Sequence, residues 1–265
     1  MTKRKIRLSK ISALHYFKLV FRSLLFLATL ISYVIHKLRA DGAPVTMEFR
    51  PVILGVVGVV FVTEMILRFF PSSLESMGCQ KQFKKNFIST DVARPYRSHR
   101  SILWVAAAWL GLNGAIGALY LTHLIDAGIL VLICLAYSVC DMICILFFCP
   151  FQTWFMKNKC CGSCRIYNWD YAMMFTPLVF IPDFYTYSIL ALALLLLLYW
   201  EIIAFRHPER FAEETNGCLS CANCKEKLCH HKKQLRSFLR ANKEVLLLKG
   251  NTVIERAKNK IKRKK

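Results

Sequence analysis

Long runs of mostly apolar residues are the feature that most limits how this chain can fold. A helix that crosses the hydrocarbon core of a membrane needs roughly 20 consecutive, predominantly apolar residues. Five runs come close to this length: Phe17–Ile35, Val52–Phe70, Ile102–Leu121, Gly128–Phe148 and Ser188–Phe205. With 55% hydrophobic residues among 265, the chain is predicted to form an all-α, polytopic bundle of membrane helices.

A sixth and shorter apolar run covers residues 166–182. We expect it to form a helical hairpin with 188–205, which brings the predicted number of membrane spans to six. The alternative is a re-entrant half-helix at 171–182, interrupted by Pro177 and Pro182. A half-helix of this kind is tolerated inside a membrane only when it is buried against protein.

The distribution of Lys and Arg predicts the orientation of the bundle. Basic residues crowd the N-terminal tail, the 71–100 loop and the tail after Arg206, whereas the loop between Leu121 and Gly128 contains none. Cytoplasmic loops carry an excess of Lys and Arg, so the three basic segments are expected in the cytoplasm. An even number of spans satisfies this condition. The chain is therefore predicted to be a multi-pass protein of the inner cell membrane with both termini cytoplasmic.

The first apolar run follows a basic N-terminal tail, as the apolar region of a secretory signal peptide does. However, Leu38-Arg39-Ala40 is a poor cleavage site and Arg22 interrupts the run, so we predict a helix that is retained. Long basic side chains in membrane helices usually extend toward the interface. We therefore expect Lys18 and Arg22 to point toward the membrane surface.

Four cysteines after the last apolar run have the spacing C-x2-C-x2-C-x4-C: Cys218, Cys221, Cys224 and Cys229. Bacterial ferredoxins ligate 4Fe–4S clusters with C-x2-C-x2-C-x3-C-P. Here the last gap is one residue longer and His230 replaces the proline. Pairs of cysteines with two residues between them also bind zinc, for which His230 or His231 is a further ligand. We expect an iron–sulfur cluster at these four cysteines, with zinc or unligated thiols as alternatives.

A second group of cysteines lies in the 149–165 loop: Cys149, Cys160, Cys161 and Cys164. Cys149 closes the fourth apolar run, and Pro150 ends that helix because proline lacks the N–H that continues it. Four thiols suffice for a second metal centre, or for ligands shared with the later group. The predicted topology places both groups in the cytoplasm, where structural disulfides are rare. A small, cysteine-rich, metal-binding cytoplasmic cap is therefore expected.

The segment Cys144-Ile-Leu-Phe-Phe-Cys149-Pro150-Phe151 resembles part of a family of membrane polyferredoxins. Those proteins carry Cys-x3-Cys-Pro at the inner end of a span and ferredoxin-type motifs after the bundle. Here the gap is x4, only one such pair is present, and a complete pair of ferredoxin motifs is missing. The resemblance implies electron transfer between a quinone or cytosolic donor and a partner oxidoreductase. The alternative is that Cys144 and Cys149 pack as small hydrophobic residues.

Polar residues of the fourth run share one helical face, within an arc of about 120°: Cys134, Tyr137, Cys140, Asp141 and Cys144. A carboxyl group inside a membrane normally faces the bundle interior. Cys140, Asp141 and Cys144 are therefore a candidate intramembrane site, for a proton relay or a soft-metal pathway. The alternative is that Asp141 only binds a polar group on a neighbouring helix, for which Glu64 is a candidate.

The third apolar run contains small residues at regular spacing, namely Gly111, Gly114 and Gly117. Residues without bulky side chains let neighbouring membrane helices approach closely. These positions therefore predict helix packing and carry no chemistry of their own.

The chain divides into a bundle at 1–205 and a cysteine-rich segment with a basic tail at 206–265. The formal net charge is +21, and basic amphipathic segments beside a membrane usually lie on anionic lipid. A basic surface also suits an acidic soluble electron carrier or a membrane oxidoreductase subunit. Nucleic acid is not an expected partner, because no base-reading fold is evident.

Nucleotide and hydrolase motifs are missing from the sequence. We therefore expect an integral membrane protein that carries cytoplasmic iron–sulfur clusters and transfers electrons, as a subunit of a membrane oxidoreductase if it takes part in an enzyme. The alternative is a zinc-binding transporter or scaffold, or a sensor of a soft metal, without redox activity.

Overall fold

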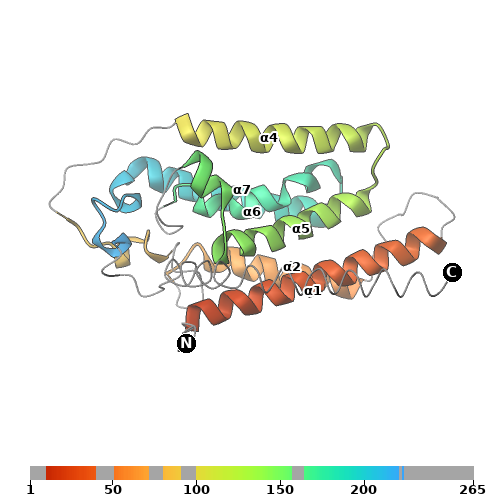
Figure 1. Cartoon of the computed structure of the whole chain (residues 1–265), viewed down its shortest axis with the longest axis horizontal. Helices are drawn as coiled ribbons and strands as arrows, with labels where there is room; N and C mark the ends of the chain where they lie inside the picture. The colour runs from red at the N-terminus through yellow and green to blue at the C-terminus, as the bar shows by residue number, and fades with distance from the viewer. Residues whose placement is uncertain are drawn as a thin grey trace, which may run out of the picture. The chain divides into compact units, whose positions relative to one another are not determined.

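The computed structural model of this chain describes residues 10–39, 51–71, 80–90, 100–156, 164–220 and 223. These residues fall within one unit, Lys10–Glu226. They form helices of several lengths and one isolated β-bridge, between Ser89 and Asn216 (Figure 1). The predicted all-α class is confirmed for this part of the chain.

Four helices of the described residues are long and apolar enough to cross a membrane: α1 (Lys10–Arg39), α4 (Arg100–Leu121), α5 (Ala127–Leu146) and α7 (Phe184–Arg206). All four coincide with predicted apolar runs. The remaining long run forms α2 (Pro51–Leu67), which has 17 residues. The prediction of a membrane helix bundle is confirmed to this extent.

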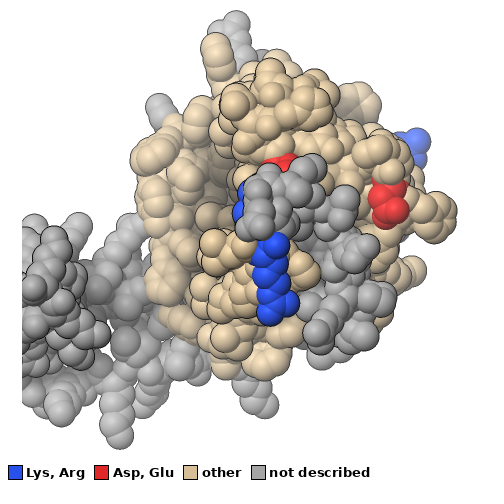
Figure 2. Space-filling view, turned by 90° about the vertical axis from the view of Figure 1, so that its right-hand side faces the viewer, with Lys and Arg blue, Asp and Glu red and all other residues tan. Residues whose placement is uncertain are grey.

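The outward-facing surfaces of the long helices are apolar. Only 11% of the apolar stretch of α1 and 17% of that of α4 are buried, and Leu24, Ile31, Leu103 and Trp104 are among the exposed side chains. Charged residues are also sparse among the described residues on the face seen in Figure 2. Soluble monomers rarely expose apolar patches of this extent, so a lipid environment is the setting that this surface fits.

The apolar run at 166–182 is not one continuous helix. It comprises the short 3-10 helix η4 (Tyr167–Trp169), then α6 (Asp170–Phe175) and the 3-10 helix η5 (Thr176–Phe180). Together α6 and η5 extend about 20 Å at most, at ~1.5–2 Å per residue, whereas the hydrocarbon core is about 30 Å thick. The six-span topology stays a prediction.

Protein surrounds the α6–η5 segment. It packs against both α5 and α7, and its inner residues Met174, Phe175 and Leu178 are buried. The Phe175 ring meets the Phe61 ring of α2 edge-on, with ring centroids 5.4 Å apart. This burial is the condition under which a broken helix is tolerated at membrane depth.

Short elements occupy the ends of the long helices. They are η1 (Lys84–Asn86), the π-helix η2 (Phe151–Phe155), η6 (Pro208–Phe211) and η7 (Gly217–Leu219). Trp200 of α7 joins two of these regions, because its ring lies edge-on to Phe83, with centroids 5.0 Å apart, and to Phe211, with centroids 6.2 Å apart. The end of α7 is thereby packed against the segments at 80–90 and 208–220.

Helix α1 is polar on its buried side. Among residues 12–39 of this helix, those that are buried are polar and lie three or seven positions apart, on one helical face: Ser12, His15, Arg22 and Thr29. The apolar residues of α1 mostly face outward, and the helix packs along α5 (Figure 1). The polar face of α1 is therefore available for charged contacts inside the bundle.

Asp126 connects the start of α5 to the end of α1. Its carboxylate caps α5 by accepting from the Ile129 N–H (3.0 Å), and it accepts from the Tyr33 hydroxyl (2.8 Å) and Lys37 Nζ (3.1 Å). Burial raises the pKa of Asp126, but these hydrogen bonds and the charge of Lys37 lower it more, so the pKa lies below its ordinary value of 3.8.

We expect stability to depend on the ionisation of Asp126. Because its folded pKa is lowered, its contribution is present above the ordinary pKa and is lost as pH falls through the folded pKa. Thermal unfolding in detergent, followed by circular dichroism between about pH 5 and pH 3, should show a smaller loss of stability in Asp126→Asn than in the unmodified protein. Asparagine is chosen because it still caps a helix. Equal pH dependence of the two proteins would contradict this prediction.

Candidate functional site

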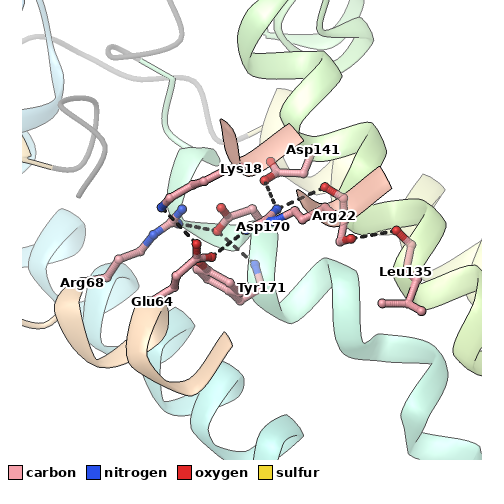
Figure 3. Close-up of polar contacts among 9 residues, drawn as sticks. Lys18, Arg22, Glu64, Arg68, Leu135, Asp141, Asp170 and Tyr171 are labelled. Carbon is pink, nitrogen blue, oxygen red and sulfur yellow. Dashed lines mark hydrogen bonds and ion pairs between the residues drawn. The ribbon is translucent and has the colours of Figure 1, made fainter. Parts of the chain in front are cut away.

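Buried and partly buried charged side chains from α1, α2, the residue after α2, α5 and α6 meet inside the bundle (Figure 3). We call this group the charge network. It contains three basic and three acidic side chains that are joined by ion pairs: Lys18, Arg22, Arg68, Glu64, Asp141 and Asp170. Equal numbers of each sign leave the group with no net formal charge, which limits the cost of burying it.

Arg22 connects three helices of the charge network. Its Nη2 lies 2.7 Å from Glu64 Oε2 on α2, and its Nη1 lies 3.2 Å from Asp141 Oδ2 on α5. The same Nη1 donates to the backbone carbonyl of Ser138 at 3.1 Å. Arg22 is 2% exposed, so the expectation that it extends to the membrane surface is wrong. The two carboxylates hold it inside the bundle.

Arg68 and Asp170 form the second half of the charge network. Arg68 Nη1 lies 2.5 Å from Asp170 Oδ1, and the guanidinium lies 4.5 Å from the centroid of the Tyr171 ring. The Tyr171 hydroxyl donates to Glu64 Oε2 at 2.8 Å, and Lys18 Nζ lies 3.1 Å from Glu64 Oε1. Glu64 therefore links the two halves.

A cavity of about 140 Å³ borders the charge network. Its walls come from α4, α5, η2, the 164–167 segment and α6, and both Asp141 and Asp170 line it. Aromatic side chains of Trp109, Tyr137 and Phe151 form part of the lining. Cys140, Asp141 and Cys144, predicted as one intramembrane site, all line this cavity.

Two cysteines of the loop group line the same cavity, namely Cys149 and Cys164. The thiols of Cys144 and Cys149 are close enough to interact, and the Gln152 N–H donates to Cys149 Sγ at 3.4 Å. The structure thus brings together thiols from two groups that were predicted separately. Cys160 and Cys161 lie outside the described residues.

The later cysteine group begins at a well-packed junction. Asn216 is completely buried and donates from Nδ2 to the carbonyls of Lys81 (3.0 Å) and Arg210 (2.9 Å). Its Oδ1 accepts from the backbone N–H groups of Cys218 (3.1 Å) and Ile88 (3.4 Å). We call this arrangement of the segments 80–90 and 208–220 the Asn216 junction, and it holds the backbone of Cys218 in place.

The predicted ligands Cys221, Cys224 and Cys229 lie outside the described residues. Within the described part of the chain, no group of three or more His, Cys, Asp or Glu side chains is arranged to hold a metal ion. The predicted metal centres at these positions and at the loop cysteines stay predictions. Arg68 and Asp170 were not predicted as parts of a site, although a charged residue within or beside an apolar run is the signal that identifies both.

Comparison with models of known protein families, with curated proteins and with solved structures finds no match to this chain.

Proposed function

We propose that this is a multi-pass membrane protein that holds an iron–sulfur cluster on the segment after α7 and transfers electrons through it. The proposed ligands are Cys218, Cys221, Cys224 and Cys229, whose spacing is similar to that of ferredoxin ligands. The observation that carries the proposal is the Asn216 junction, which fixes the backbone at the first of these four cysteines.

A fixed first ligand matters because metal centres depend on the packing and hydrogen bonds that support their ligands. Gly217 N–H donates to the Ile88 carbonyl at 2.8 Å, and Thr90 N–H donates to the Thr215 carbonyl at 3.4 Å. The Asn223 side chain also donates to the Gly217 carbonyl at 3.0 Å. These contacts tie the chain on both sides of Cys218 to the 80–90 segment and to itself.

An acidic soluble electron carrier is the partner that we propose, with a membrane oxidoreductase subunit as the alternative. The formal net charge of +21 favours encounters with acidic proteins, because opposite charges raise association rates. A ferredoxin-like or flavodoxin-like carrier has the required charge. Weaker binding at high salt is expected, since salt screens charges at the protein surface.

Metal analysis of the full-length protein tests the proposed cluster. We expect anaerobically purified protein to be brown and to contain iron and acid-labile sulfide in equal amounts. Cys218→Ser should lose most of both, because serine is a poor replacement for a thiolate ligand. Cys134→Ala is the matched control, because Cys134 is buried in the core and belongs to neither cysteine group. The iron and sulfide contents of this variant should equal those of the unmodified protein.

A colourless protein without iron after anaerobic purification would refute the proposed cluster. Zinc without sulfide would instead select a zinc-binding transporter or scaffold. Equal losses of iron in Cys218→Ser and Cys134→Ala would show that the loss reflects general damage to the fold.

A further inference from the structure

Sulfur-containing side chains are concentrated around the cavity beside the charge network. Six of its lining residues contain sulfur: Cys140, Cys144, Cys149, Cys164, Met173 and Met174. They come from separate parts of the chain, on α5, after α5, before η4 and on α6. Thiolate and thioether groups are soft ligands, which select soft cations such as Cu(I) over hard cations.

The carboxylates of the cavity are not available as ligands for a hard cation. Asp141 is bound by Arg22 at 3.2 Å and Asp170 by Arg68 at 2.5 Å. Mg²⁺ and Ca²⁺ require several oxygen ligands, and each carboxylate here already neutralises a buried guanidinium. The coordination chemistry that this cavity offers is therefore that of sulfur.

Cys144 and Cys149 are the two sulfur ligands that lie in contact. Their thiols are close enough to interact and both line the cavity, although five positions separate them in the sequence. This contact exists because α5 ends at Leu146 and the chain turns at Phe147 before Pro150 starts the next helical segment. Both side chains are only partly buried, so a cation has access to them.

We infer that this cavity binds one monovalent soft cation, of the Cu(I) or Ag(I) class, between the sulfur atoms of Cys144 and Cys149. These d¹⁰ cations accept two sulfur ligands in a line, whereas structural zinc takes four ligands in a tetrahedron. Binding replaces the two thiol protons, which are released to solvent. The other four sulfur-containing side chains supply a soft, polarizable wall around the cation.

This site is independent of the proposed iron–sulfur cluster. The two sites use different residues and different metals. The cavity lies within the membrane bundle, whereas the proposed cluster lies on the segment after α7. A protein that lacks iron can still bind Cu(I) in the cavity, and a protein with an intact cluster can fail to do so.

Competition for Cu(I) tests the inference. The full-length, reduced protein in detergent is titrated anaerobically with Cu(I) held by bathocuproine disulfonate, whose colour reports the copper that the protein removes. We expect Cys144→Ala/Cys149→Ala to remove one equivalent less than Cys134→Ala. The X-ray absorption spectra of copper-loaded Cys134→Ala and of the copper-loaded double variant are then subtracted. The difference should show a copper ion with two sulfur neighbours.

A second measurement uses the unmodified sequence and does not depend on how the variant folds. Cu(I) or Ag(I) should protect Cys144 and Cys149 from alkylation, as located by mass spectrometry of peptides, while Zn²⁺ should not. Equal copper binding by the double variant and Cys134→Ala would overturn the inference, as would protection that omits these two cysteines. Loss of iron and sulfide in the double variant would also overturn it, because Cys149 would then be a cluster ligand. Iron lost from Cys218→Ser with cavity copper retained supports both proposals separately.

Discussion

Replacing Arg22 with methionine is expected to destabilise the protein by about 3–5 kcal/mol, the typical cost of removing one partner from a buried ion pair. Arg22 donates hydrogen bonds to both Glu64 and Asp141. Glu64 keeps Lys18 and Tyr171 as partners in the variant, whereas Asp141 loses the ion pair that anchors it. Unfolding in detergent with an increasing fraction of a denaturing surfactant, followed by tryptophan fluorescence, measures the change.

Lys37→Met is the matched control for Arg22→Met. Lys37 lies on the same helix and pairs with Asp126 at 3.1 Å, but its side chain is 42% exposed. Exposed ion pairs contribute only about 0–1 kcal/mol, so this variant should be far less affected. Adding Asp141→Asn to Arg22→Met should restore part of the stability, because the unpaired charge is removed. Equal destabilisation by Arg22→Met and Lys37→Met would show that the loss of stability does not come from burial of the charge network.

Replacing Gly117 with leucine is expected to destabilise the protein by about 1–3 kcal/mol, the usual cost of overpacking a tight contact. Gly117 on α4 faces the Phe180 ring of η5, and a Cβ at this position would lie only 2.6 and 2.7 Å from Phe180 Cε1 and Cε2. The ring is held in part by Tyr120, with ring centroids 6.5 Å apart. The same unfolding measurement in detergent applies.

Gly114→Leu provides the control on the same helix. An added Cβ at Gly114 meets no atom within 4 Å, so its effect should stay within about 0.5 kcal/mol. The double variant Gly117→Leu/Phe180→Ala lacks the aromatic ring that the leucine would overlap. Its loss of stability should therefore be smaller than the sum of the losses in the two single variants. Additive effects, or equal effects at Gly114 and Gly117, would contradict the contact between α4 and η5.

The sequence predicts helices where local chemistry is sufficient to define them. Four apolar runs became membrane-length helices because an uninterrupted stretch of such residues satisfies its own backbone hydrogen bonds. Asp126 and Asp183 cap α5 and α7, and capping is also a local property. The structure of the 166–182 segment was harder to predict, because Pro177 interrupts an apolar run whose composition alone suggested a membrane span.

Contacts between distant residues could not be read from periodicity. The position of Arg22 near the start of a long helix suggested that it extends to the membrane surface, yet carboxylates 42 and 119 residues further along the chain hold it inside. Likewise, three glycines of α4 look equivalent in sequence, but only Gly117 of these three has a neighbour against it. Which face of a helix meets a partner depends on the whole arrangement of the bundle.

Local sequence therefore determined the apolar helices, their caps and the two spaced groups of cysteines, since each depends on neighbours within a few turns of chain. Only the tertiary structure decided that Glu64, Asp141 and Asp170 neutralise three buried cations, and that Cys144 and Cys149 line one cavity with Cys164 and two methionines. The physical reason is that charges and ligands removed from water must find partners in space. Those partners come from helices that the sequence places far apart.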